Sequence, residues 1–130
     1  MLVVDASVLA VALVDDAADG DRARARLRGE ALAAPDLIDL EVASALRGRV
    51  AGGHVPVRRA ELALADLGAL PLQRVPAGRL VSRCWELRDN LTIYDAAYVA
   101  LAEALGARFL TADARLAGST GARCPVEVLQ

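Results

Sequence analysis

Short apolar segments alternate with longer segments of helical periodicity along the whole chain. The first apolar segment, LVVD at residues 2–5, is followed by the helical pattern SVLAVALV at residues 7–14. This alternation is typical of an α/β fold around a mainly parallel sheet, because each return to a parallel strand needs a crossover, which is usually a helix. We expect strands at residues 2–5, 31–35, 72–76, 107–111 and 126–130.

Helical periodicity is clearest between Thr92 and Gly106. Apolar residues recur there at the spacing of one helix face, while Thr92 opens the segment and Gly106 ends it. Further patterns predict helices at residues 20–29, 36–50, 56–70 and 78–90, and one helical turn at residues 113–117. A chain of 130 residues is long enough for one domain with a sizeable core.

Composition excludes several classes of protein. The formal net charge of −2 argues against binding nucleic acid through bulk positive charge, but it leaves room for a nuclease with local charge or metal ions. Every basic residue is arginine, so mechanisms that depend on a lysine are excluded. Cys84 and Cys124 lack metal-site spacing and His54 is the only histidine, so we expect ordinary thiols, a surface histidine and no zinc.

The N-terminal segment gives no sign of a targeting or membrane sequence. It has no basic stretch, and Asp5 interrupts its apolar run well short of the roughly 20 residues that a membrane span needs. We therefore expect a cytoplasmic protein that does not enter a membrane.

The predicted topology places three aspartates near one edge of the sheet. Asp5 ends the first strand and Asp113 follows the fourth, while Asp95 lies at the start of the helix that leads into the fourth. In open α/β sheets, sites lie beyond the carboxyl ends of the strands. Taken singly, each aspartate is better explained as a helix cap, and Asp95 stands at the capping-box spacing from Thr92.

Glu41 differs from these aspartates because it lies inside a predicted helix, where no cap is needed. Its neighbours one turn away include Leu37, Ile38 and Ala45, so it projects from an apolar face. A carboxylate held there must be paired, neutralised or metal-bound. The alternative is a rotated helix that leaves Glu41 at the solvent edge or beside an arginine.

Convergence of the four acids would favour a cation site. Clustered carboxylates repel one another, and a fold keeps such a cluster mainly when a cation completes it. Oxygen ligands without histidine or cysteine select hard ions, so the expected guest is Mg²⁺ or Mn²⁺.

Four motifs together resemble the PIN-domain ribonucleases and, among them, the VapC toxins of type II toxin–antitoxin modules. They are VVDASVL (3–9), LIDLEVASALR (37–47), NLTIYDAAYVALAEALG (90–106) and FLTADARLA (109–117). The motifs stand in the order of the family and cover nearly the whole chain. This resemblance implies one PIN domain over residues 1–130, folded as a three-layer α/β/α sandwich with a mainly parallel central sheet.

The same resemblance implies a catalytic and metal-binding quartet of Asp5, Glu41, Asp95 and Asp113. These acids would hold Mg²⁺, with Mn²⁺ as a substitute, and the protein would be an endoribonuclease that hydrolyses RNA phosphodiester bonds with metal-activated water. Asp113 is either a ligand or an outer partner of the site.

Three further residues are candidates for supporting roles. Ser7 and Thr111 match hydroxyl positions of the family and are expected to orient carboxylates or bound water. Asn90 is either a turn residue or a support of the site. Some PIN proteins carry a further acid or amide where this chain has Leu116, so a second ion would have a thinner protein shell here.

The resemblance also implies partners: a VapB-type antitoxin, an RNA substrate and a second copy of the chain in a homodimer. Segment 56–70 is either core or an exposed apolar surface for dimer or antitoxin. The alternative function is a non-catalytic PIN-like module that binds RNA or protein. Loss of an acid is the usual sign of such a module, and all four acids are present.

Several aromatic and basic residues receive structural interpretations. Tyr94 and Tyr98 are expected to pack against the sheet, and Trp85 to lie in the core or in a protein interface. The arginines of residues 22–28 are expected on a solvated helix face, with phosphate steering or antitoxin contact as the alternative.

Overall fold

The computed structural model describes residues 1–118 and 121–130. Its sheet consists of β1 (Leu2–Val4), β2 (Leu32–Pro35), β3 (Leu72–Val75), β4 (Arg108–Thr111) and β5 (Val126–Val128). The strand order is β3-β2-β1-β4-β5, and every neighbouring pair is parallel. The predicted parallel α/β fold is therefore confirmed.

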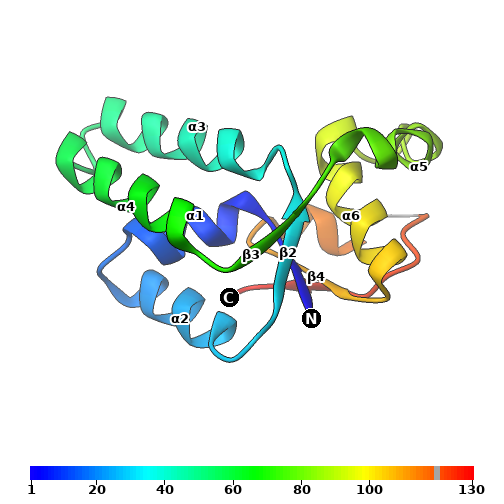
Figure 1. The fold of residues 1–130 in the computed structure, drawn as a ribbon, viewed down its shortest axis with the longest axis horizontal. Helices are drawn as coiled ribbons and strands as arrows, with labels where there is room; N and C mark the ends of the chain where they lie inside the picture. Colours follow the sequence, from blue (N-terminus) through cyan, green and yellow to red (C-terminus); the bar gives the residue numbers. More distant parts are fainter. Residues whose placement is uncertain (119–120) are drawn as a thin grey trace.

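Helices cover both faces of this sheet, as Figure 1 shows. Helices α1 (Ala6–Val14), α2 (Ala18–Leu27), α3 (Ile38–Ala51) and α4 (Val57–Ala69) pack together on one face. On the other face lie α5 (Val81–Glu86) and α6 (Ile93–Leu105), and α6 packs directly on β1, β2 and β4. The result is the expected three-layer α/β/α sandwich.

The segment between β3 and α6 differs from its prediction as one continuous helix. A 3₁₀ turn, η1 (Ala77–Leu80), precedes α5, and α5 ends at Glu86. Beyond it, Leu87 and Leu91 are both buried, so the turn between these leucines directs their side chains into the core. The predicted turn after β4 is present as the 3₁₀ helix η2 (Ala114–Gly118).

Local signals set the ends of α6. The Thr92 hydroxyl accepts a hydrogen bond from the Asp95 backbone N–H at 3.1 Å, and Gly106 closes the helix with a φ of 61°. Glycine adopts this left-handed conformation without the steric cost that a side chain would add. Both predicted ends are confirmed.

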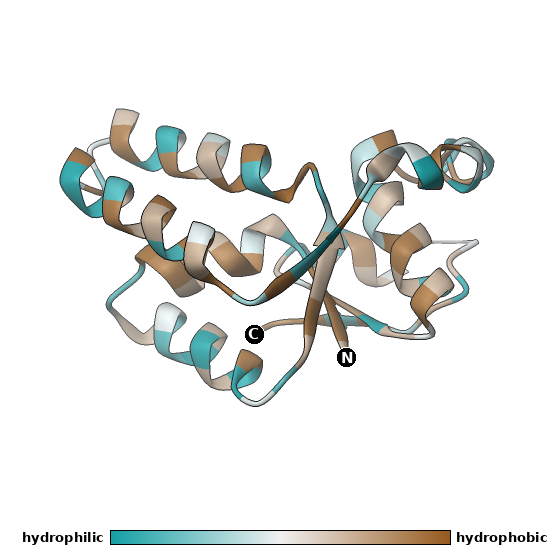
Figure 2. Cartoon of the chain, viewed as in Figure 1, coloured by the Kyte–Doolittle hydropathy of each residue, from teal (hydrophilic) through white to brown (hydrophobic). Residues whose placement is uncertain are grey.

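The interior is continuous from the sheet into the helices. Strand β1 is fully buried, and the buried stretch of α6 runs from Ala96 to Ala102. Figure 2 shows the apolar β2 in the centre and hydrophilic residues on the outer helix α2. None of the helices in the described part of the chain combines the length and the apolar character that a membrane span needs.

Topology brings three helix starts to one edge of the sheet. One residue, Asp5, separates β1 from α1, and two residues separate the end of β2 from the start of α3. Helix α6 leads into β4, so it runs back across the sheet from the carboxyl edge. Acids in the first turns of such helices share this edge, and helix dipoles favour negative charge there.

Candidate active site at the carboxyl edge of the sheet

Asp5 is the most enclosed acid of the site, with a side chain only 8% exposed. Its Oδ2 accepts hydrogen bonds from Ser7 Oγ at 2.9 Å and from Thr111 Oγ1 at 2.7 Å. The backbone N–H of Ala112 in turn donates to Ser7 Oγ at 3.1 Å. Asp5 makes no side-chain cap bond to α1, so the capping interpretation is wrong. Both hydroxyls instead orient this carboxylate.

Glu41 lies in the first turn of α3 and is half-buried. Burial raises the pKa of its carboxyl, the hydrogen bond from Tyr98 lowers it, and the nearby charges of Asp5 and Asp95 raise it; the net shift is upward. The alternative of an arginine partner is wrong, since no described residue forms an ion pair with Glu41.

Asp95 reaches the same place from the opposite layer. Burial and then the negative charge of Asp5 raise the pKa of its carboxyl most. The hydrogen bond with Thr92 lowers this pKa, and the charges of Asp113 and Arg115 have smaller, opposite effects. The net shift is upward. The fold thus brings Asp5, Glu41 and Asp95 within electrostatic range of one another, although they are far apart in the sequence.

Asp113 is placed differently from the other three acids. Arg115 donates to its Oδ2 from Nη2 at 2.6 Å and to its Oδ1 from Nε at 3.0 Å, and the Arg115 backbone N–H also donates to Oδ1 at 3.0 Å. These bonds hold the pKa of Asp113 below its usual value. The capping interpretation is confirmed for this residue. It reaches the cluster electrostatically through Asp95, and it links to Asp5 through Thr111, whose Oγ1 accepts from the Asp113 N–H at 3.1 Å.

Tyr98 is a site residue that the sequence analysis missed. The ring packs on the sheet as predicted, with its centroid 5.8 Å from that of Phe109, and the side chain is buried. Its hydroxyl donates to Glu41 Oε1 at 2.6 Å, which fixes one carboxylate oxygen of the cluster. The available signal was its spacing of three residues from Asp95, which puts both side chains on one face of α6.

The aromatic and basic residues outside the acidic cluster agree with their predictions only in part. Tyr94 is 66% exposed, so its predicted packing against the sheet is wrong. Trp85 is 62% exposed, and the guanidinium of Arg88 lies 4.6 Å from the centroid of its ring. His54 is an exposed turn residue as predicted. Arg26 does not lie on a solvated face, because its guanidinium pairs with Glu127 of β5 at 2.7 Å.

The donors of the site match a hard cation in chemistry. Asp5, Glu41 and Asp95 offer only oxygen, and among the described residues none of the three is in an ion pair. A bound cation would relieve the mutual repulsion of these carboxylates, which contributes to the raised pKa values of Glu41 and Asp95. As the side chains stand, however, no group of three or more His, Cys, Asp or Glu within residues 1–118 and 121–130 is arranged to hold a metal ion.

A small cavity adjoins Asp95. Its volume is about 260 Å³. The residues that line it come from the turn before α6, from α6 and from η2: Asn90, Leu91, Thr92, Asp95, Arg115, Leu116 and Gly118. Asn90 therefore shares this cavity with Asp95, and its supporting role stays a prediction.

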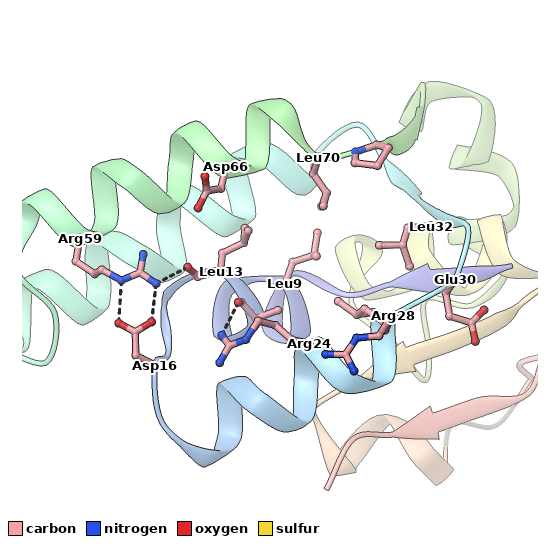
Figure 3. A pocket seen from close by; sticks show the side chains of 13 residues that line it. Leu9, Leu13, Asp16, Arg24, Arg28, Glu30, Leu32, Arg59, Asp66 and Leu70 are labelled. Carbon is pink, nitrogen blue, oxygen red and sulfur yellow. Dashed lines mark hydrogen bonds and ion pairs between the residues drawn. The ribbon is translucent and has the colours of Figure 1, made fainter.

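A larger cavity of about 610 Å³ lies between α1, α2 and α4 (Figure 3). None of the predicted site residues lines it. Its lining contains leucines and charged side chains: Leu9, Leu13, Leu27, Leu32 and Leu70, with Asp16, Arg24, Arg28, Glu30, Arg59 and Asp66. Arg59 donates to both carboxylate oxygens of Asp16, at 3.0 and 3.1 Å. This cavity thus combines leucines with charged side chains and contains none of the acids of the site.

Comparison with known proteins places this arrangement in context. Residues 2–118 match the family model described as the PIN domain. Ribonuclease VapC9 of Mycobacterium tuberculosis is 41% identical over 129 residues, which cover 99% of this chain and 98% of that relative.

Solved structures share the fold at lower sequence identity. M. tuberculosis VapC20, a toxin that cleaves the sarcin-ricin loop, superimposes with a TM-score of 0.67 at 17% identity, covering 84% of this chain and 87% of the other. VapBC2 of Rickettsia felis, solved with a DNA fragment of its promoter, gives a TM-score of 0.71 at 11% identity, covering 99% and 98%.

Proposed function

This chain belongs to the PIN-domain family and groups with its VapC ribonucleases, and we propose that it is the endoribonuclease toxin of a toxin–antitoxin pair. One observation carries the proposal. Three carboxylates, of Asp5, Glu41 and Asp95, share the carboxyl edge of the sheet without an ion-pair partner among the described residues. A fold that keeps such repulsion gains from it only when a cation and an anionic substrate arrive.

We assign the divalent metal, Mg²⁺ with Mn²⁺ as a substitute, to these three carboxylates, with Asp113 as a further ligand or outer partner. Such an ion, when bound, lowers the pKa of a coordinated water and neutralises charge on the phosphate that is attacked. Carboxylate oxygens are the donors that these hard ions prefer. Catalysis then needs no covalent nucleophile, in agreement with a chain that has one exposed histidine.

The residues around the carboxylates orient them. Ser7 and Thr111 both donate to Oδ2 of Asp5, so its Oδ1 is the oxygen available to a cation. Tyr98 occupies Oε1 of Glu41 in the same way and leaves Oε2 available. Hydroxyl donors of this kind fix carboxylate orientation before a ligand arrives, which is the role of outer-shell partners in metal sites.

The test replaces the carboxylate that has no capping role. Glu41→Gln keeps the size of the side chain and its hydrogen bond from Tyr98, so the variant should fold normally. We expect cleavage of a panel of structured RNAs in Mg²⁺ to fall about 100-fold or more, as for loss of a metal-site residue. Glu86→Gln, at an exposed position of α5, is the matched control and should cut at the parent rate.

The same assay separates this function from a non-catalytic PIN-like module. A module would bind RNA or protein and would not cleave any member of the panel with either metal. Parent and Glu41→Gln proteins that cut equally fast would show that cleavage does not use the acidic cluster.

We propose a VapB-type antitoxin as the partner and assign its contact to the cavity between α1, α2 and α4. Leucines with a charged surround suit an amphipathic segment of such a protein. Leu70→Glu, which adds a charge to the lining, should reduce co-purification with the product of the neighbouring reading frame; unchanged co-purification would move the contact elsewhere.

The homodimer stays a prediction, for which exposed Val57, Leu62 and Leu64 of α4 are a candidate surface.

A further inference from the structure

Arg115 occupies an unusual position for a residue with so many hydrogen bonds. Its side chain is 85% exposed, yet Nε and Nη2 both donate to the carboxylate of Asp113. The same guanidinium acts on Asp95, whose pKa it lowers. It is thus an exposed cation next to a cluster whose other acids have no ion-pair partner among the described residues.

The cavity beside Asp95 gives this cation a place to bind an anion. Arg115 is the one basic side chain among the described residues that line it, and Asn90 and Thr92 add polar groups. A phosphodiester in this cavity would lie directly beside an acid that we assign to catalysis. The cavity is therefore placed to hold the part of an RNA chain next to the bond that is cut.

The geometry points to Arg115 as a phosphate-binding residue that exchanges Asp113 for the RNA backbone; this inference rests on the proposed ribonuclease function. In the free protein the guanidinium neutralises Asp113. When RNA enters, the guanidinium moves to a phosphate in the cavity. Oδ2 of Asp113 then becomes available, while Oδ1 keeps its bond from the backbone N–H of Arg115. Substrate binding thus completes the fourth acid of the site.

Two physical arguments make the exchange favourable. Exposed ion pairs contribute little to stability, since water and salt screen them, so breaking the pair with Asp113 costs little. Arginine binds phosphate with two parallel hydrogen bonds, a geometry as favourable as its present one on the carboxylate. The positive charge of Arg115 therefore still has an anionic partner in the complex, which is the phosphate of the RNA.

The experiment measures RNA binding without turnover, in the Glu41→Gln background. The affinity for a single-stranded RNA is followed from low to high salt, with Arg115 present, with Arg115→Ala, and with Arg115→Lys. One phosphate contact contributes about 0.7 to the slope of log K against log salt for single strands. We expect Arg115→Ala to reduce the slope by about this amount and to weaken binding several-fold at low salt, whereas Arg115→Lys should keep the slope.

The matched control is Arg28→Ala, which removes another exposed arginine, one that lines the larger cavity. A slope that falls equally in both variants, or in neither, would overturn phosphate binding by Arg115. A merely structural role in η2 would lower the melting temperature and leave the slope unchanged.

A second readout tests the release of Asp113. Without RNA, Arg115→Ala should shift the Mn²⁺ concentration at half-maximal thermal stabilisation to a lower value than in the parent, because Oδ2 of Asp113 no longer has the guanidinium as a partner. An unchanged midpoint would overturn the release. If the parent cuts RNA while both readouts are flat, this inference fails and the proposed function stands; if the parent cuts no RNA, the proposed function fails first.

Discussion

Glu41 and Glu103 are both half-buried glutamates on helices that flank the sheet, but they lie in opposite surroundings. Glu103 accepts hydrogen bonds from Nε and Nη2 of Arg83 at 2.7 and 3.0 Å and from the Arg123 backbone N–H at 2.6 Å. Glu41 accepts one bond, from a tyrosine, and lies near two other carboxylates. Burial raises the pKa of both acids, yet the bonds from Arg83 and Arg123 bring that of Glu103 below its usual value, whereas that of Glu41 stays raised.

The difference shows that this fold pairs several partly buried acids with arginines but leaves Asp5, Glu41 and Asp95 without such a pair among the described residues. Asp39 pairs with Arg74, and Glu127 pairs with Arg26, both at N–O distances near those of Glu103. With 15 arginines available, the lack of a cation at Asp5, Glu41 and Asp95 is not a shortage of partners. Sequences depart from such local rules mainly at functional sites, where the unfavourable arrangement is used.

The largest expected effect on stability comes from breaking the ion pair between Arg83 and Glu103. Arg83→Ala leaves Glu103 half-buried without its main partner and removes a third bond, from Nη2 to the Gly121 carbonyl at 2.7 Å. We expect a loss of about 2 kcal/mol in the free energy of unfolding, since a half-buried charge loses its hydrogen bonds. Denaturant unfolding measures this loss.

Glu41→Gln is the counterpart in the same assay, because it removes a charge that the fold does not neutralise. Its stability should equal or exceed that of the parent without metal. A comparable loss in both variants would mean that the two glutamates are stabilised alike, and the contrast between the two regions would not hold.

A smaller effect is expected from supplying the missing cation. An ion that binds only the folded state at ten times its Kd adds about 1.4 kcal/mol, or a rise of about 5 °C in Tm for a chain of this size. Mn²⁺ should produce such a rise in the parent and lose it in Asp5→Asn. The control Asp89→Asn, an exposed aspartate before α6, should keep it; a flat response of the parent at millimolar Mn²⁺ would contradict the metal assignment.

Topology made much of this site predictable from the sequence. Strand–helix alternation fixes which residues reach the carboxyl edge, and that was enough to bring Asp5 and Asp95 near one another. Thr92 and Gly106 marked the ends of α6 because capping and left-handed backbone are local properties. The two helix ends depend on residues a few positions apart, so the local sequence pattern is enough to predict them.

Side-chain partners across the fold were not predictable in this way. The bond from Tyr98 to Glu41 joins residues 57 positions apart, and the pair of Arg26 with Glu127 joins residues 101 apart. Arg115 lies only two residues from Asp113, but either residue can turn to solvent, so spacing alone does not decide whether they pair. The exposure of Tyr94 and Trp85 likewise depends on how far the layers extend beyond each helix.

The smallest expected effect, and the one that separates the two glutamates most directly, is the pH dependence of stability in metal-free protein. The folded pKa of Glu41 is raised above the unfolded value near 4.5. Its contribution to stability is therefore fully present below that value and is lost as pH rises through the folded pKa. The folded pKa of Glu103 is lowered, so its contribution is present above 4.5 and is lost as pH falls through the folded value.

The two Gln variants should consequently diverge from the parent in opposite directions. At pH 7, Glu41→Gln gains stability relative to the parent and Glu103→Gln loses it, and both differences shrink as the solution is acidified. The Glu41 difference should shrink first, because its folded pKa lies above 4.5 and that of Glu103 below it. Urea unfolding from pH 7 down to about pH 3, with a chelator present, gives both curves, since the Glu103 difference shrinks only below 4.5. Parallel curves would show that Glu41 and its neighbouring carboxylates do not repel one another in the folded protein, and the reason for expecting a cation among them would be gone.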